Sequence, residues 1–194
     1  MDQHKYNQLV EKAFGFLYEY EFSRIEGQDC LCVSESDRVR MQIAYDCHRS
    51  FEIVVEFGLR RQGEASSLSM YSISECLRAV NELAAAERFC LIQAAPERLE
   101  EVLCLISGVV RQSLWSFVTG EASVYANAES ERRRAWEKYV SDKQRQEYVS
   151  LAREAWHLAQ YDRVVELLSG ISDSLDNADA LRLKLAVERC RKSR

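Results

Sequence analysis

The sequence predicts an α+β fold: a small antiparallel β-meander covered by helices, with an all-helical C-terminal part. Hydrophobicity alternates with a period of two between residues 29 and 57, helical periods of three and four flank that stretch, and the composition turns polar after residue 120. With 194 residues, 47% of them hydrophobic and 29% charged, the chain is long enough for one sizeable core. We therefore expect an α+β domain over residues 1–120 and a helical extension over residues 121–194.

The N-terminal segment KYNQLVEKAFGFLYEY predicts an amphipathic helix over about residues 3–18, because its apolar residues recur every three or four positions. In VRMQIAY and FEIVVEF, apolar and polar residues alternate, as in strands that bury one face. Aligning the two apolar faces pairs Tyr45 with Phe51 and leaves a hairpin loop over residues 46–50.

The preceding segment CLCVSESDR predicts a third strand that pairs Val33 with Val39 and Leu31 with Met41 across the loop SESDR, so that Leu31 and Val33 face the core. In this register Cys30 lies roughly 16 Å from Cys47. Zinc requires four converging ligands and usually takes its cysteines from CxxC motifs, whereas this strand contains CxC. We therefore predict no metal site and no cofactor.

Helices are predicted to cover the apolar face of the meander. SISE has the form of a capping box in front of a helix over about residues 73–92. A second, longer helix follows Pro96 and is expected to end at Gly120. Its continuous apolar stripe makes it the expected centre of the core.

The segment after residue 120 predicts an exposed helix with a break near Ser141 and Asp142, followed by three helical pieces. Small residues at 152, 155 and 159, with an aromatic residue at 161, resemble one tetratricopeptide helical hairpin. One repeat is too short for a solenoid, so we expect a hairpin that packs on the main body.

The whole layout resembles uncharacterised bacterial immunity-like proteins, which accompany secreted toxins. The resemblance is carried by the N-terminal helix, the YD…F.I.V.F pattern, the helix opened by YSISE and the tetratricopeptide-like tail. It implies a cytosolic bacterial protein that works by binding another protein, and it supplies no catalytic residues.

Composition limits the compartment and the partner. The seven cysteines are odd in number and several lie on apolar faces, which is typical of reduced thiols in the cytoplasm, and no apolar run is long enough to span a membrane. The first 120 residues hold 18 of the 31 acidic residues but only 12 of the 26 basic ones. This balance disfavours nucleic acid and favours a basic protein partner. The sequence does not indicate an oligomeric state.

The DCHRS segment combines residue types that nucleophilic chemistry uses, but neighbours at a hairpin tip splay apart, so we interpret it as a polar turn. Glu52 and Glu56 lie about 13 Å apart on the solvent side of one strand, too far to act as a catalytic pair. We predict no enzymatic activity. The candidate partner-binding residues are Asp46, His48, Arg49, Glu52 and Glu56.

Two alternatives remain open. The helix over residues 131–145 carries basic and aromatic residues that could grip phosphates and stack bases: Arg132, Arg133, Arg134, Trp136 and Lys138. Acidic residues interrupt this run, so a solvated helix is the favoured interpretation. The other alternative is an enzyme whose site is assembled from residues distant in sequence, which a deep pocket lined by titratable groups would indicate.

Overall fold

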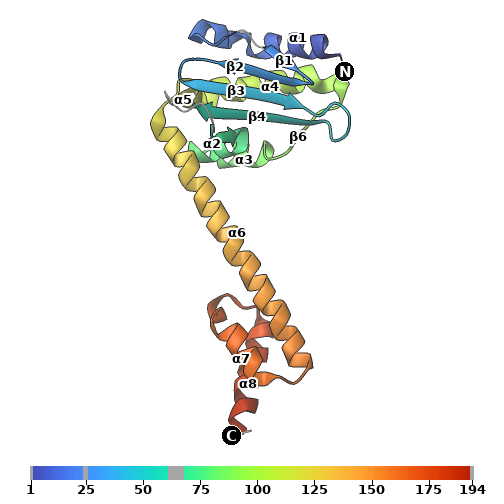
Figure 1. Cartoon of the computed structure of the whole chain (residues 1–194), viewed down its shortest axis with the longest axis vertical. Helices are drawn as coiled ribbons and strands as arrows, with labels where there is room; N and C mark the ends of the chain where they lie inside the picture. The colour runs from blue at the N-terminus through green and yellow to red at the C-terminus, as the bar shows by residue number, and fades with distance from the viewer. Residues whose placement is uncertain (1, 24–25, 61–67, 193–194) are drawn as a thin grey trace. The chain divides into compact units, whose positions relative to one another are not determined.

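A computed structural model describes residues 2–23, 26–60 and 68–192 (Figure 1). The fold is α+β, as predicted, and the chain divides into two compact units, Met1–Arg132 and Arg133–Arg194. The first unit extends beyond the predicted boundary at residue 120, because Tyr125 and Ala128 are buried in its core.

The first unit contains an antiparallel sheet in the order β1-β2-β3-β4-β5. A further strand, β6, also pairs with β4, at the opposite end of β4 from β5. The strands are β1 (Glu26–Gln28), β2 (Leu31–Glu35), β3 (Val39–Tyr45), β4 (Glu52–Leu59), β5 (Met70–Ser72) and β6 (Ile92–Gln93).

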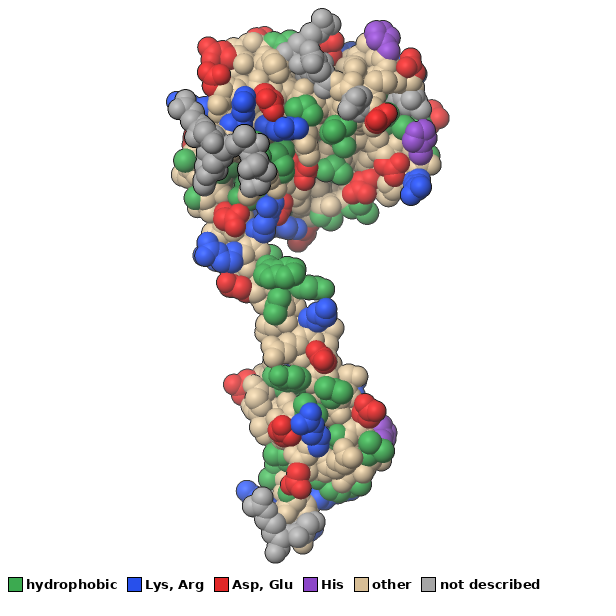
Figure 2. All heavy atoms as spheres, in the orientation of Figure 1, with side chains coloured by type: hydrophobic (Ala, Val, Ile, Leu, Met, Phe, Trp, Pro, Cys, Tyr) green, Lys and Arg blue, Asp and Glu red, His purple; other side chains and the backbone are tan. Residues whose placement is uncertain are grey.

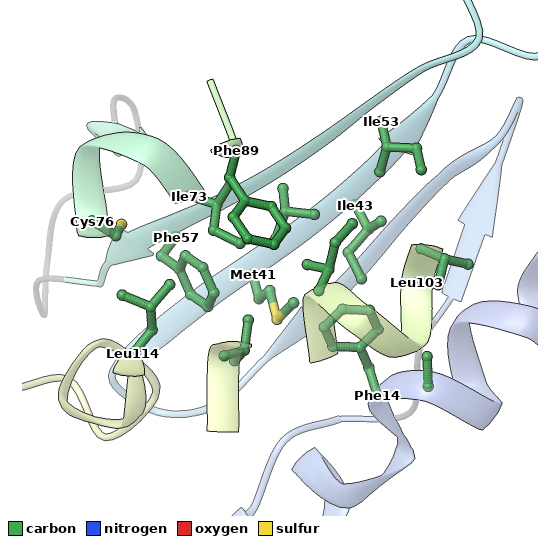
Figure 3. Close-up of a cluster of buried hydrophobic side chains, with 14 of the residues drawn as sticks. Phe14, Met41, Ile43, Ile53, Phe57, Ile73, Cys76, Phe89, Leu103 and Leu114 are labelled. Atoms are coloured by element: carbon green, nitrogen blue, oxygen red, sulfur yellow. The ribbon is translucent and has the colours of Figure 1, made fainter. Parts of the chain in front are cut away.

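Helices cover one face of this sheet (Figure 1). The helices of the first unit are α1 (Gln3–Phe14), α2 (Ile73–Ala79), α3 (Leu83–Arg88), α4 (Leu99–Ser113) and α5 (Trp115–Val118), with 3-10 turns η1 (Gly15–Tyr20) and η2 (Pro96–Arg98). Inward-facing strand residues such as Met41, Ile43 and Phe57 meet Phe14 and Leu103 of the helices, and all five are buried (Figure 3). This layer between sheet and helices is the hydrophobic core.

The predicted helices are shorter than expected. The helix predicted over residues 73–92 is two helices followed by β6, because Asn81 adopts a left-handed φ of 65° that ends α2. Its N-terminus is as predicted: Ser72 and Glu75 form a capping box. The following long helix is interrupted at Leu114, and Gly120, with φ 71°, ends α5 as expected.

The first helix differs in the same way. α1 ends at Phe14, and the chain continues as the 3-10 turn η1 to Tyr20 where an α-helix to about residue 18 was expected. Ser107 of α4 donates a hydrogen bond to the Ala13 carbonyl oxygen at 2.6 Å, so the last turn of α1 is anchored to α4.

The register between β3 and β4 is shifted by two residues from the prediction. Tyr45 pairs with Ile53 and not with Phe51, which has a φ of 53° and lies outside the strand. The loop therefore includes Phe51. Because the shift is even, the predicted faces are correct: Ile43, Tyr45 and Ile53 all point into the core.

The register between β2 and β3 is shifted by an odd number of residues, so the side chains of β2 that were predicted to face the core face outward. Val33 pairs with Gln42, where a pairing with Val39 was predicted, because the turn is tighter than expected and Ser36 N–H donates to the Val39 carbonyl at 2.8 Å. Cys32 and Ser34 therefore point into the core, while Leu31 and Val33 point outward. The prediction that Leu31 and Val33 face the core is wrong.

The second unit contains most of α6 (Ala122–His157), α7 (Tyr161–Ser169), the 3-10 turn η3 (Ser172–Ser174) and α8 (Asn177–Lys192). The predicted break near residues 141–142 is wrong: α6 is continuous over 36 residues, and Asp142 pairs with Arg145 at 3.3 Å on its surface. The predicted helical pieces bury a small core of their own, formed by Ala152, Ala155, Val164, Leu167, Leu168 and Ala186.

Candidate functional site

The outward face of the sheet is the candidate site, since no helix of the described chain covers it (Figure 1). The pairing places Leu31, Ala44 and Val54 side by side in one row across β2, β3 and β4. In the next row Val33 lies beside Gln42, which lies beside Glu56. Cross-strand neighbours have Cβ atoms about 5 Å apart, so the apolar side chains form one patch. We call this patch and its charged border the open face.

Charged side chains border the apolar patch. Glu52 precedes Val54 by two positions on β4 and points the same way, while Glu56 accepts a hydrogen bond from the Gln42 amide. At the other end Glu35 lies 3.4 Å from both Arg40 and Arg60. The two glutamates of β4 have no cationic partner among the described residues, so the acidic border is not neutralised there.

The open face is hydrophobic in its centre and charged around it. Figure 2 shows hydrophobic side chains gathered over the middle of β2, β3 and β4, with acidic groups around them and Lys and Arg groups at one side. Leu31, Val33, Ala44 and Val54 are all half-buried. An apolar cluster inside a charged border is typical of a surface that binds another protein.

The acidic border of this face is predictable from the sequence, but its apolar centre is not. Glu52 and Glu56 lie on it as predicted. Leu31 and Val33 were assigned to the core because the predicted β2 register had the wrong parity. The tendency of cysteine to be buried was the only signal for the observed orientation, since it favours Cys30 and Cys32 inward.

The DCHRS loop is organised by Asp46. Its carboxylate accepts hydrogen bonds from the backbone N–H of His48 and Arg49 at 3.1 Å, and from Ser50 N–H at 3.0 Å and Ser50 hydroxyl at 2.9 Å. These bonds, led by those from Ser50, lower the pKa of Asp46 to about 2. The Asp46 carboxylate is thus occupied within the loop, while His48 and Arg49 are exposed.

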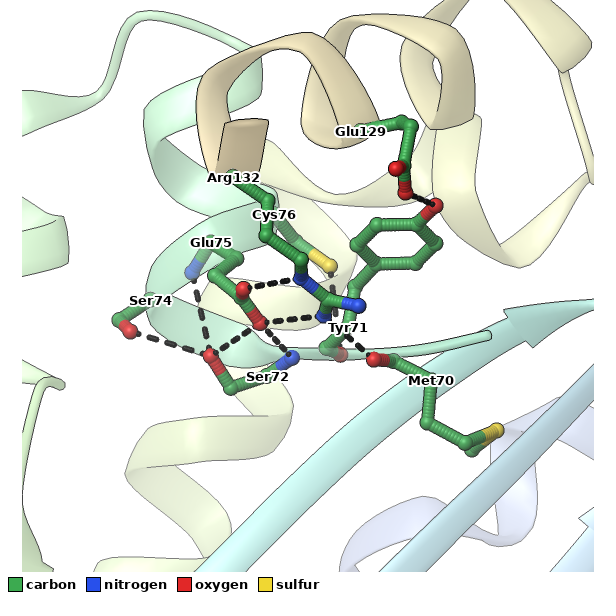
Figure 4. A network of polar contacts seen from close by, with 8 residues as sticks. All are labelled: Met70, Tyr71, Ser72, Ser74, Glu75, Cys76, Glu129 and Arg132. Carbon is green, nitrogen blue, oxygen red and sulfur yellow. Dashed lines mark hydrogen bonds and ion pairs between the residues drawn. The ribbon is translucent and has the colours of Figure 1, made fainter. Parts of the chain in front are cut away.

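A polar network binds the first residue of the basic run on α6, Arg132, to residues of the first unit (Figure 4). Arg132 donates to both carboxylate oxygens of Glu75, at 2.7 and 2.9 Å, and to the Met70 carbonyl oxygen. Its guanidinium carbon lies 4.2 Å from the centre of the Tyr71 ring, and Tyr71 in turn donates to Glu129 at 2.7 Å. Arg132 is therefore part of the first unit, and its Nε and Nη2 donors are already used.

The remaining basic residues of the run are exposed on α6. These are Arg133, Arg134 and Lys138. Between them Trp136 is 64% exposed, and its ring lies 5.7 Å from that of Tyr139. The structure thus leaves an aromatic pair beside three basic side chains and removes Arg132 from the predicted set.

The described cysteines include one close pair. Cys30 Sγ and Cys47 Sγ are 3.4 Å apart, so the predicted separation of about 16 Å is wrong. The cause is the β2 register, which moves Cys30 beside Tyr45, whose N–H donates to the Cys30 carbonyl at 2.9 Å. Within the described part of the chain, no three His, Cys, Asp or Glu side chains converge to hold a metal ion.

A surface hollow of about 530 Å³ lies between η1 and the turn joining β2 to β3. Its titratable residues, Glu19, Tyr20, Glu21, Asp37 and Arg38, are all exposed. Catalytic groups are usually desolvated, and these are hydrated, so the hollow lacks the features expected of an active site. Nowhere in the described ranges is there a helix both long and apolar enough to cross a membrane.

Comparison of the chain with protein-family models, with curated proteins and with solved structures gave no match.

Proposed function

We propose that this chain is a non-enzymatic protein-binding module that binds its partner through the open face. The observation that supports the proposal is the apolar patch of Leu31, Val33, Ala44 and Val54 on a sheet face that no helix of the described ranges covers. Burying such side chains is favourable by about 25 cal/mol per Å² of apolar area. A complex in which the partner covers the patch is stabilised by this burial, and neither protein has to unfold to form it.

The border of the open face defines the chemistry of the partner. Glu52 and Glu56 have no cationic partner among the described residues, so they favour a surface that presents Lys or Arg around an apolar centre. His48 and Arg49 lie exposed on the loop that leads into β4. The resemblance to immunity-like proteins makes a toxin or effector our specific proposal for the partner, with binding in the bacterial cytoplasm that masks its active surface.

The proposal is tested by a pull-down with the tagged full chain from the host lysate at moderate salt, followed by mass spectrometry. The double variant Glu52→Lys/Glu56→Lys is compared with the control Glu87→Lys/Glu97→Lys, which makes the same change in net charge at exposed sites outside the open face. We expect one stoichiometric basic protein that the control retains and the first variant loses. Equal recovery by both variants would exclude the open face.

A second candidate function is nucleic-acid binding by α6, favoured by the exposed Trp136 and the neighbouring Arg133, Arg134 and Lys138. It predicts quenching of Trp136 fluorescence by single-stranded DNA at low salt, lost in Trp136→Phe and weakened steeply by added salt. Absence of any binding at low salt would eliminate this candidate.

A further inference from the structure

Cys30 and Cys47 form a thiol pair at one end of the sheet. The Cys30 thiol lies within hydrogen-bonding distance of Cys47 Sγ, at 3.4 Å. Cys30 is 5% exposed, whereas Cys47 is half-buried and reachable from solvent. The two sulfurs need to approach by a little more than 1 Å to reach the disulfide bond length of about 2.05 Å.

The backbone on both sides holds this pair together. Asp29 and Cys30 have left-handed φ values of 52° and 57°, and the Cys30 N–H donates to the Gln3 side chain of α1. Cys47 is held in place by the loop that the Asp46 carboxylate organises. Because these hydrogen bonds fix the segments on which both thiols lie, the contact is a property of the fold.

The third cysteine of this region is engaged elsewhere. Cys32 is 1% exposed, and its Sγ lies 3.2 Å from the Asn7 Oδ1 atom. Burial, followed by the contact with Cys47, raises the pKa of Cys30 to about 11. Cys30 is therefore a poor initial nucleophile, and of the two thiols in the pair Cys47 is the one that a reagent in solution meets first.

We propose that Cys30 and Cys47 are an oxidisable dithiol that a low-molecular-weight disulfide converts to an intramolecular disulfide. The Cys47 thiol loses its proton to water, and the thiolate attacks one sulfur of the reagent, whose S–S bond breaks and releases one thiolate. The Cys30 thiol then loses its proton and attacks Cys47 Sγ, releasing the second thiolate. Two electrons pass from the pair to the reagent, which is reduced to two thiols.

The new bond would tie the start of β2 to the loop that carries His48 and Arg49. This modification site stands independently of the proposed binding function, because it rests only on the geometry of the two thiols.

The test is oxidation of the reduced, folded full chain with glutathione disulfide, followed by acid quenching, alkylation, trypsin digestion and mass spectrometry. Cleavage at arginine places Cys47 in the peptide 41–49, and Cys30 with Cys32 in the peptide 25–38. We expect these two peptides to be joined, with a loss of about 2 Da for the two thiol hydrogens. The exposed Cys90 and Cys104 report that the reagent has acted, because they are accessible to form mixed disulfides with glutathione.

Three variants identify the pair. Cys32→Ser should retain the joined peptides, whereas Cys30→Ser and Cys47→Ser should abolish them. If Cys30→Ser does not fold, Cys32→Ser alone decides, because a link to the peptide 25–38 that survives without Cys32 must end on Cys30. The proposal is overturned if the peptide 41–49 is recovered unjoined while Cys90 and Cys104 are modified, if the joined peptides persist in Cys30→Ser, or if they are lost in Cys32→Ser.

Discussion

Replacing Arg132 with alanine is expected to destabilise the first unit by about 2 kcal/mol. The Arg132 and Glu75 side chains are 35% and 24% exposed, and their two hydrogen bonds measure 2.7 and 2.9 Å. A fully exposed ion pair contributes about 0–1 kcal/mol, and breaking a buried one costs about 3–5 kcal/mol, so this partly desolvated pair lies between them. The contact with the Tyr71 ring at 4.2 Å adds about 0.5–1 kcal/mol.

The measurement is urea unfolding monitored by hydrogen exchange and mass spectrometry of the peptides that contain β5 and α2, so that the first unit is followed separately. Arg133→Ala is the matched control, because Arg133 is the neighbouring residue and is exposed; it should change stability by less than about 0.5 kcal/mol. Arg132→Lys should restore only part of the loss, since lysine cannot make two parallel bonds to a carboxylate. Equal effects of Arg132→Ala and Arg133→Ala would refute the reasoning.

The same ion pair has a defined pH dependence. Burial alone would raise the pKa of Glu75, but hydrogen bonds from Arg132 and Ser72 outweigh burial and lower it below 4.5. A lowered folded-state pKa means that the stabilisation is present above pH 4.5 and is lost as the pH falls through the folded-state pKa. The stability difference between the wild type and Arg132→Ala should therefore shrink in acid. A difference that stays constant from pH 7 to about pH 2.5 would contradict this assignment.

Three further predictions concern backbone strain, a buried carboxylate and the thiol pair. Gly120→Ala should destabilise the first unit by about 1–2 kcal/mol, because φ is 71° and an added Cβ would meet the turn between β2 and β3. Gly108→Ala in α4, where an added Cβ meets no atom within 4 Å, should stabilise it by about 0.5–1 kcal/mol. Thermal unfolding of the two variants measures both effects. Asp179 is 2% exposed, and its arginine partners lower its pKa. Asp179→Asn should therefore destabilise the second unit by about 1–2 kcal/mol at pH 7, and by less as the pH falls below 3.8. Urea unfolding followed by circular dichroism measures this difference. Oxidation that joins Cys30 to Cys47, 17 positions apart, should stabilise the chain by about 3 kcal/mol in the same unfolding assay, and an unchanged midpoint would contradict it.

Much of the fold could be predicted because local rules and global packing agree. The alternation in VRMQIAY and FEIVVEF identifies β3 and β4 and their buried faces, and SISE identifies the start of α2. The interruptions were missed because each depends on one residue whose conformation is not specified by periodicity. Asn81 ends α2 in a left-handed conformation, and Leu114 separates α4 from α5 within one apolar stripe.

The candidate site was predicted only in part. Glu52 and Glu56 could be assigned to the outer surface because they alternate with large apolar residues on β4. The strand β2 offers no such contrast, since LCVSE places small, weakly polar residues opposite larger apolar ones. Leu31 and Val33 are the more apolar pair, but a tight turn involving Ser36 sets the register and turns Cys32 and Ser34 inward.

The orientation of β2 explains why the open face and the thiol pair occur together. Turning β2 inward with Cys32 and Ser34 leaves Leu31 and Val33 half-buried, although these two side chains would contribute more to the core. Ser34 compensates by donating to the Ser23 carbonyl at 2.7 Å, so the core accepts a polar group without leaving it unsatisfied. Stability alone does not explain why Cys32 and Ser34, and not Leu31 and Val33, occupy the core side of β2. This orientation of β2 is explained if the open face binds a partner, because the apolar area of Leu31 and Val33 is then available to that partner.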